Sequence, residues 1–406
     1  MLRDPVLLKR TLNLPLLVLY GLGTTIGAGI YALVGEMAGI AGYYAPVSFL
    51  VASILAALTA LSFAELSGRY PRCAGAALYV KEGLSSERLS TIVGFLVIAA
   101  GLVSAAAIIN GFVAYLAEFT ALDRQAAIII VTLIIGAVAA WGIAESVTIA
   151  AFVTLIEIGG LLLVIAVSSS GLAEIPARWK QMIPGMDYGS WYGVYAGSLL
   201  AFYAFIGFED MVEVAEETRN VRRTLPLGIM LTLGLTTLLY MAVTVTAVMS
   251  IAPEQLARSQ VPLARLYEFH TGGNATIITV IGLFALINGA LIQLIMASRV
   301  LYGMGSRKLL PAVFSTVNRR TQTPLVATSL ATAAILMLAL SGTLASLAEA
   351  PSLIMLTVFS LVNLSLLSVK RKYPEPEGLI VFPFVVPLLG FVVSSAFVVM
   401  EAASLF

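Results

Sequence analysis

The sequence predicts an all-α polytopic membrane protein with about eleven transmembrane helices, arranged as an inverted repeat whose first and sixth spans are broken at mid-membrane. Of its 406 residues, 60% are hydrophobic and 11% are charged, which leaves too few charges to cover a water-soluble globule of this size. Apolar runs of about 20 residues, the length that crosses a bilayer, follow one another from Leu14 to the C-terminus. Glycines and acidic residues interrupt two of these runs. A lipid bilayer is therefore the expected surrounding.

Apolar runs between polar breaks place the expected spans at residues 14–40, 43–66, 91–119, 125–141, 146–169, 190–216, 225–250, 275–303, 324–341, 345–369 and 379–402. With a cytoplasmic N-terminus, 18 of the 23 Lys and Arg residues fall on the inner side. This asymmetry predicts a multi-pass protein of the cell membrane with its N-terminus in the cytoplasm. Because the basic start leads directly into a long, glycine-broken apolar run, we expect no cleaved secretory signal.

Two loops are longer than a simple turn: residues 70–90 on the inner side and residues 251–274 on the outer side. The outer loop alternates polar and apolar residues with near-helical spacing. It is either a short amphipathic helix at the mouth of a cavity or a surface helix without a gating role.

Residue counts argue against several classes of function. The chain has one cysteine, Cys73, and one histidine, His270, which are too few for an internal disulfide, a His/Cys metal site or a His-based catalytic pair. A net charge of +1 gives no reason to expect nucleic acid as a partner. The chain also lacks a G-x-x-x-x-G-K-[ST] phosphate loop. We therefore expect neither an enzyme nor a nucleotide-driven pump, and no cofactor or metal.

The first span contains the run GLGTTIGAG, from Gly21 to Gly29. Each glycine costs about 1 kcal/mol relative to alanine inside a helix, so four of them favour a break in the span. Close helix packing is the alternative, because Gly23 and Gly27 form a Gly-x-x-x-Gly pair. The sixth span is interrupted in a similar way, where Phe205–Asp210 places a glycine and two acids inside an apolar run.

The two interrupted spans are five spans apart, which predicts two five-helix units of opposite orientation at residues 1–170 and 190–370, followed by an additional span at 371–406. An unwound segment is tolerated in hydrocarbon only where it lines a protein cavity. Half-helix N-termini there present N–H groups to an anion, and half-helix C-termini present carbonyls to a cation. A zwitterion such as an amino acid matches both, so we expect a small-molecule substrate at the breaks.

Four stretches, GLGTTIGAGIYALVG, SFLVASILAALTALSFAELSGRYPRCAGAALYV, AFYAFIGFEDMVEVAEETRNVRRTLPLGI and SRVLYGMGSRKLLP, occur in this order over most of the chain. In this combination the sequence resembles the amino acid, polyamine and organocation (APC) transporter superfamily. The resemblance implies the LeuT-type fold, a five-plus-five inverted repeat, which agrees with the repeat inferred from the two interruptions.

The resemblance also implies a substrate site. The backbone N–H groups of Thr25, Ile26, Gly27, Ala28 and Gly29 would bind a substrate carboxylate. Carbonyls near Phe202, Tyr203 and Phe205 would receive its ammonium group, with Tyr203 or Phe205 as an aromatic gate. Thr24 and Thr25 would either contact the substrate or bond back to their own helix. Asn110 and Asn288, each in mid-span, are either pocket wall or polar links between helices.

Glu157 is the outstanding ionisable residue, because it lies in the middle of the fifth span. Many members of the superfamily carry a lysine here, whose ammonium stands in for a sodium ion. Burial penalises the charged form of a carboxyl group, so Glu157 either carries a proton or binds a cation with the Gly23 carbonyl and the Ser298 hydroxyl. A permanently protonated, purely structural glutamic acid is the third alternative.

Further acids follow the second break. The resemblance implies that Glu209 relays charge between the substrate site and the cytoplasmic half. Glu213, Glu216 and Glu217 lead toward Arg219, Arg222 and Arg223, and this group is expected to be an interfacial charge cluster.

These expectations favour a secondary active transporter of amino acids or related amines, working by alternating access and driven by a proton or monovalent cation gradient. The alternatives are a cation-coupled, sodium-type symporter or an exchanger of polyamines or organocations. A channel is less favoured, because no filter sequence is visible.

Overall fold

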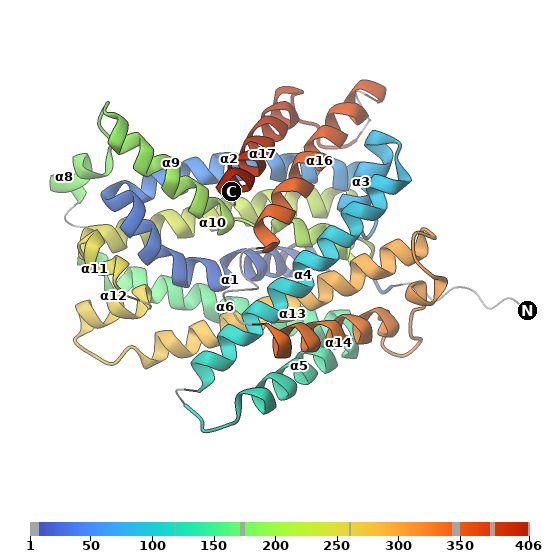
Figure 1. Cartoon of the computed structure of the whole chain (residues 1–406), viewed down its shortest axis with the longest axis horizontal. Coiled ribbons are helices and arrows are strands. Elements are labelled where there is room, and N and C mark those ends of the chain that lie inside the picture. Colours follow the sequence, from blue (N-terminus) through green and yellow to red (C-terminus); the bar gives the residue numbers. More distant parts are fainter. Residues whose placement is uncertain are drawn as a thin grey trace, which may run out of the picture.

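In the computed structural model, the apolar runs of the sequence become helices packed side by side (Figure 1). The structure describes residues 8–117, 119–170, 175–259, 261–342, 350–373 and 378–404. The regular secondary structure of these residues is helical, and an isolated bridge pairs Leu12 with Thr218. The elements are α1 (Leu14–Ala41), η1 (Gly42–Tyr44), α2 (Ala45–Arg69), α3 (Gly75–Leu84), α4 (Glu87–Leu116), α5 (Arg124–Trp141), α6 (Ile143–Val167), α8 (Ile175–Arg178), η2 (Trp179–Met182), α9 (Tyr188–Tyr203), η3 (Phe208–Glu217), α10 (Val221–Ser250), α11 (Pro253–Ala257), α12 (Pro262–Thr271), α13 (Thr276–Ser306), η4 (Ala312–Ser315), α14 (Leu325–Ser341), α16 (Ala350–Lys372) and α17 (Val385–Ser404).

The all-helical membrane fold class is confirmed. Eight helical stretches among the described residues are long and apolar enough to cross a membrane. Three shorter apolar helices, Leu14–Gly27, Leu325–Ser341 and Val385–Met400, occupy the other expected positions. The count of eleven stays a prediction.

Polar caps mark where several helices begin. The Asn13 side chain accepts the N–H of Leu16 at the start of α1. Asp123 accepts the N–H groups of Gln125 and Ala126 at the start of α5. Asp187 accepts the N–H of Ser190 at the start of α9, and this bond lowers the pKa of the Asp187 carboxyl. Acceptors that satisfy the free N–H groups of a first turn fit helix ends that meet water.

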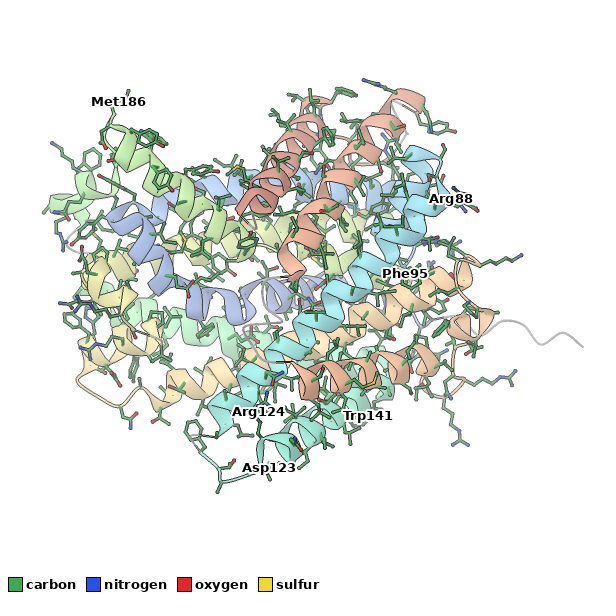
Figure 2. The ribbon with its side chains drawn as sticks, viewed as in Figure 1. Arg88, Phe95, Asp123, Arg124, Trp141 and Met186 are labelled. Carbon is green, nitrogen blue, oxygen red and sulfur yellow. The ribbon has the colours of Figure 1, made fainter. Side chains whose placement is uncertain are left out.

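Large apolar side chains cover the outside of the bundle, where a water-soluble protein would place polar ones. Figure 2 shows Phe95 on α4 and Trp141 at the end of α5, both on the outside. Their exposed fractions are 49% for Phe95 and 63% for Trp141. Phe152 on α6, 65% exposed, extends this apolar surface. Such a surface is suited to lipid, which supports the multi-pass membrane protein expected from the composition.

Helix α1 runs through the middle of the bundle (Figure 1) and contacts α6, α9, α10 and α13. The two long loops contain helices of their own: α3 lies within 70–90, and α11 and α12 lie within 251–274. The helical character expected of the outer loop is therefore confirmed. In Figure 1, α11 and α12 lie at the left end of the bundle, and the connection from α13 to α14, which contains η4, lies at the right end. These ends are called the α12 end and the η4 end below.

Candidate functional site

The first break lies at Gly27, where the backbone of α1 leaves helical geometry with φ of 6° and ψ of −141°. The two threonines before it bond back to their own helix. Thr24 Oγ1 donates to the Gly21 carbonyl over 2.8 Å, and Thr25 Oγ1 donates to the same carbonyl over 2.7 Å. Of the two roles open to these hydroxyls, the structure shows the local bond.

The second break separates α9 from η3. Helix α9 ends at Tyr203, a turn follows, and Gly207 adopts φ of +129°. This positive φ favours glycine, because L side chains rarely adopt it. The Glu209 Oε2 atom accepts the Gly207 N–H over 2.8 Å, so this carboxyl caps the turn from which η3 starts. The interruption expected in the sixth span is therefore present, and so is the one in the first.

The two breaks contact each other. Thr24 Oγ1 also donates to the Gly207 carbonyl, over 2.9 Å. A Cβ atom on Gly207 would lie 3.0 Å from the carbonyl carbon and oxygen of Thr24, so glycine permits this approach. Tyr240 of α10 joins them a second time, because its hydroxyl lies 2.6 Å from the Thr25 carbonyl oxygen and 3.0 Å from that of Ala204. Sequence reasoning missed Tyr240, since nothing marks one tyrosine in an apolar span as a partner of distant breaks.

A cavity of about 570 Å³ opens beside the breaks. Its polar lining near the breaks comes from Thr24, Thr25, Glu209 and Asp210. Helices α4 and α13 supply further walls, and α12 lines the cavity with Leu263 and Ala264. The cavity therefore extends from the breaks toward the α12 end of the bundle. Of the two roles left open for the outer loop, this lining supports a place at the cavity.

The expected substrate-site residues separate into two groups. Thr24, Thr25 and Tyr203 line the cavity. Ile26 is fully buried and is not among the lining residues, whereas Gly27 is the break itself. The side-chain surroundings of Ala28 and Gly29 lie outside the described part of the structure.

Phe202 and Phe205 lie in the packing behind the cavity. The Phe202 ring contacts those of Phe359 and Phe397, and the Phe205 ring lies 5.2 Å from that of Tyr240. Of the two expected gate aromatics, Tyr203 is the one that reaches the cavity.

Asn110 connects helices and does not line the cavity. Its amide nitrogen donates to the carbonyls of Ala106 and Ala339, and its oxygen accepts from Arg124 Nη2 over 2.6 Å. Figure 2 places Arg124 beside Asp123 at the start of α5. Of the two roles open to Asn110, the structure shows the polar link between α4, α5 and α14.

Asp210 brings a second carboxylate to the cavity. It is buried, with 2% exposed, and its Oδ2 accepts from Gln293 Nε2 of α13 over 2.7 Å. Gln293 lines the cavity as well. Within the described part of the chain, no Lys or Arg side chain pairs with Asp210 or Glu209. The cavity wall beside the breaks is therefore rich in carboxyl groups that lack a basic partner.

Glu157 belongs to α6 and is fully buried where this helix packs against α1 and α13. Its Oε1 accepts from Asn288 Nδ2 over 2.8 Å, and the same nitrogen donates to Thr154 Oγ1 over 3.0 Å. A Cβ atom on Gly23 would collide with Thr154 Oγ1, so glycine at this position lets α1 approach the group. Glu157 Oε2 and Asn288 Oδ1 have no hydrogen-bond partner among the described residues.

Ser298, expected beside Glu157, makes its contacts elsewhere. Its hydroxyl lies 2.8 Å from that of Thr328 on α14 and 3.3 Å from Arg299 Nη1. Asn288 and Thr154 are polar side chains near the Glu157 carboxyl, and the Tyr31 hydroxyl of α1 donates to the Glu157 carbonyl over 2.8 Å. Sequence reasoning left Asn288 undecided and missed Thr154, which lies one helical turn before Glu157.

The expectation of an interfacial charge cluster is wrong for Glu213 and Glu217, which are buried with 2% and 0% exposed. Glu217 pairs with the fully buried Arg299 of α13 over 2.9 Å. Glu213 accepts the Gly75 N–H at the start of α3 through both oxygens. Packing turns η3 inward, so its acids meet α3 and α13 and not the arginines that follow them in the chain.

The segment before α3 is held from both sides near the η4 end. Arg307 donates to the carbonyls of Cys73 and Ala74, and Glu216 accepts the Cys73 N–H over 3.4 Å. Burial raises the pKa of the Cys73 thiol well above its ordinary value and lowers the pKa of Arg307. These contacts close the bundle on the side of the breaks away from α12. Among the described residues, no group of three His, Cys, Asp or Glu side chains could hold a metal ion.

Comparisons with known proteins agree with this geometry. The family model described as amino acid permease matches residues 12–405. The vacuolar cationic amino acid transporter 2 of Arabidopsis thaliana is 32% identical over 398 residues, which cover 92% of this chain and 61% of that relative. The branched-chain amino acid permease BcaP of Bacillus subtilis is 29% identical over 399 residues, which cover 91% of this chain and 82% of that relative. The chain thus spans a little under two thirds of the length of this plant relative.

Two solved structures share the fold. MhsT in complex with L-phenylalanine has a TM-score of 0.66 at 14% identity, with 98% of this chain and 100% of that chain covered. A Na+-coupled sialic acid symporter in a substrate-bound outward-open state has a TM-score of 0.63 at 12% identity, with 98% and 90% covered. The LeuT-type fold is therefore confirmed.

Proposed function

Because this chain belongs to the amino acid permease family of the APC superfamily, we propose that it is a secondary transporter that moves amino acids across the membrane by alternating access. One observation carries the proposal: two broken spans meet beside a cavity of about 570 Å³ that extends toward a single end of the bundle. Breaks of this kind expose N–H groups to an anion and carbonyls to a cation. We propose no catalytic activity.

The second half of α1 starts at the break, so its first N–H groups are the proposed partners of the substrate carboxylate. Thr24 and Thr25 line the cavity immediately before this point. The ammonium group would lie beside the turn after Tyr203, where the half-helix of α9 ends with its partial negative charge. This turn also carries Tyr203 into the cavity, which supports its role as the gate.

We propose that substrates with a cationic side chain are preferred. Asp210 and Glu209 line the cavity without a basic partner in the described part of the chain, and an arginine or lysine side chain would supply one. The plant relative named above is a cationic amino acid transporter, whereas BcaP is a branched-chain permease. The carboxyl groups of this cavity favour the first type.

Glu157 is the proposed coupling group. A charged carboxylate buried without a partner is costly, and the free Oε2 of Glu157 supports either a bound proton or a bound monovalent cation. We propose the proton, because the geometry expected for a cation site included Ser298, which bonds to Thr328 and Arg299 instead. The gradient of protons across the membrane would then supply the energy.

We also retain the cytoplasmic N-terminus and the two inverted units at 1–170 and 190–370, with 371–406 as an additional span. With this orientation, the α12 end faces outward and the structure corresponds to an outward-facing state. The contacts of Glu213, Glu217 and Arg307 would then keep the cytoplasmic side closed.

The test is uptake of labelled arginine, lysine, leucine and phenylalanine into proteoliposomes, with proton and sodium gradients imposed separately. We expect arginine or lysine to accumulate under an inward proton gradient. Glu157→Gln keeps the shape of the side chain and removes ionisation, so it should abolish this accumulation. Accumulation at the native level in Glu157→Gln would reject the coupling role, and no uptake of any amino acid by the unmodified protein would reject the function.

A further inference from the structure

We propose that a groove between α9 and α17 binds one acyl chain of a membrane phospholipid. The groove is a second cavity, of about 340 Å³, and it shares no lining residue with the cavity beside the breaks. Helix α2 packs against both α9 and α17 and supplies the floor with Val51 and Leu55. These three helices lie along the upper side of the bundle in Figure 1. The inference does not depend on the proposed transport function.

The two walls of the groove are apolar stripes of helix. From α9 the lining residues are Trp191, Val194, Tyr195 and Ser198. From α17 they are Val393, Ala396, Phe397 and Met400. Both sets follow the spacing i, i+3, i+4 and i+7, which marks the face that a helix buries against a neighbour. Here the two stripes face each other across open space, so hydrocarbon between them would supply the apolar partner that each stripe needs.

Contacts at two levels hold the walls of the groove in place. The Tyr195 hydroxyl of α9 donates to the Met400 Sδ atom of α17 over 2.8 Å. One further turn and a half into the membrane, the Phe202 and Phe397 rings meet edge-on with their centroids 5.2 Å apart. Protein interiors leave few voids, because atoms that line a void lose their dispersion contacts. A groove that the packing itself keeps open is therefore suited to an occupant.

The lining selects a hydrocarbon occupant. Its two hydroxyl groups already have partners, since Ser198 donates to the Val194 carbonyl over 2.7 Å and Tyr195 donates to Met400. A dry apolar cavity of about 150 Å³ holds a benzene molecule, so this groove has room for a stretch of acyl chain. One turn of an α-helix, about 10 Å across and about 5.4 Å long, fills about 420 Å³. A helix from a second copy of the chain is therefore too large for the groove.

The source of the hydrocarbon is the bilayer, because the groove is continuous with the lipid-facing surface of the bundle. Trp191 at its rim is 49% exposed, and Val399 beside it on α17 is 67% exposed. At the start of α9 the Tyr188 and Tyr192 rings stack with their centroids 6.0 Å apart. Exposed tyrosine and tryptophan rings of this kind lie at the level of the lipid headgroups. A phospholipid can thus keep its headgroup at this level while one chain enters the groove.

Tryptophan fluorescence tests the site directly, because Trp191 is one of only three tryptophans in the chain. Replacing Trp141 and Trp179 by phenylalanine leaves Trp191 as the sole tryptophan. A phospholipid with brominated acyl chains, titrated into the protein in detergent, quenches a tryptophan that it contacts. We expect quenching of Trp191 to saturate near one lipid per protein. In the control protein Trp141 is the sole tryptophan, exposed at the end of α5, and its quenching should be weak and should not saturate.

Ala396→Phe fills the groove from α17, so it should raise the lipid concentration that gives half-maximal quenching about tenfold or more. Val399→Phe is the matched control, because it adds the same ring to the same helix outside the groove. It should leave the titration unchanged. Phospholipid should also raise the unfolding temperature of the unmodified protein by mass action, and this gain should be lost in Ala396→Phe.

Equal quenching of Trp141 and Trp191, or a native titration in Ala396→Phe, would overturn the proposal. If Ala396→Phe does not fold, the comparison of the two single-tryptophan proteins still decides. A dimer in detergent whose Trp191 is shielded from the lipid would assign the groove to a second copy and would also contradict the proposal. A protein that transports no amino acid would leave every one of these results unchanged, so the two proposals fail separately.

Discussion

Gly207→Ala is the substitution that tests most sharply how closely the two broken spans approach. An alanine there must adopt φ of +129°, a conformation that costs a non-glycine residue of order 1–3 kcal/mol. Its methyl group would also lie 3.0 Å from the carbonyl carbon and oxygen of Thr24. Main-chain atoms cannot move aside as easily as the end of a flexible side chain, and overpacking of this kind costs about 1–3 kcal/mol.

Together these terms put the penalty at about 2–6 kcal/mol, borne mainly by the contact between Thr24 and Gly207. If this penalty destabilises the substrate-binding arrangement of the two breaks by only about 2 kcal/mol, the affinity for the substrate falls about 30-fold. The assay is equilibrium binding of labelled arginine to the purified protein, with thermal unfolding measured in parallel. The affinity should fall even where the protein remains folded.

Gly234→Ala is the control, because Gly234 lies in α10 and, apart from the adjoining backbone of its own helix, no heavy atom among the described residues lies within 4 Å of a Cβ placed there. It should leave affinity unchanged and stability equal or slightly raised, since alanine is favoured over glycine in helices. Native affinity in Gly207→Ala would show that substrate binding does not need the approach of the two breaks.

Three further outcomes are expected. Asp210→Asn removes the negative charge and keeps the bond to Gln293, so uptake of arginine should fall at least tenfold relative to leucine; equal losses for both would assign Asp210 a structural role. Cys73, the single cysteine, is buried and its pKa is raised by burial, so maleimide should label it slowly even as pH rises from about 7 to 9, where a free thiol ionises. Mass spectrometry would measure the rate of labelling, which should rise when the η4 end opens. Labelling that is fast from the outset would contradict the closed arrangement. Glu217→Gln leaves Arg299 as a buried charge without its partner and should cost about 3–5 kcal/mol of stability, seen as a lower unfolding temperature. The double variant Glu217→Leu/Arg299→Met should recover much of the loss, and a double variant no more stable than the single one would count against the pair.

Local composition was sufficient to predict the helices and both breaks. Apolar runs predicted the helices because a bilayer span is set by length and hydrophobicity, which are readable along the chain. The breaks at Gly27 and at Gly207 were predicted because glycine and paired acids are costly in a regular membrane helix. Glu157 was recognised for the same reason, as a charge in the middle of an apolar run.

What the sequence could not predict depends on which helix faces meet. Tyr240 is a single tyrosine in a span, and its two acceptors lie 36 and 215 residues away in the chain. Asn288 meets Glu157 only because α13 packs against α6 at this level. Glu213 and Glu217 were read as part of a surface cluster because arginines follow them, yet η3 turns both acids into the bundle. Sequence spacing carries no information about such rotations.

Counterflow in proteoliposomes distinguishes alternating access from passage through a pore, because a carrier must return its site from one side of the membrane to the other while a pore need not. Vesicles would be loaded with unlabelled arginine and exposed to a trace of labelled arginine without any ion gradient. If the protein works by alternating access, we expect transient accumulation of label above its equilibrium level. Uptake that is independent of internal arginine, or the absence of uptake for every amino acid tried, would contradict it.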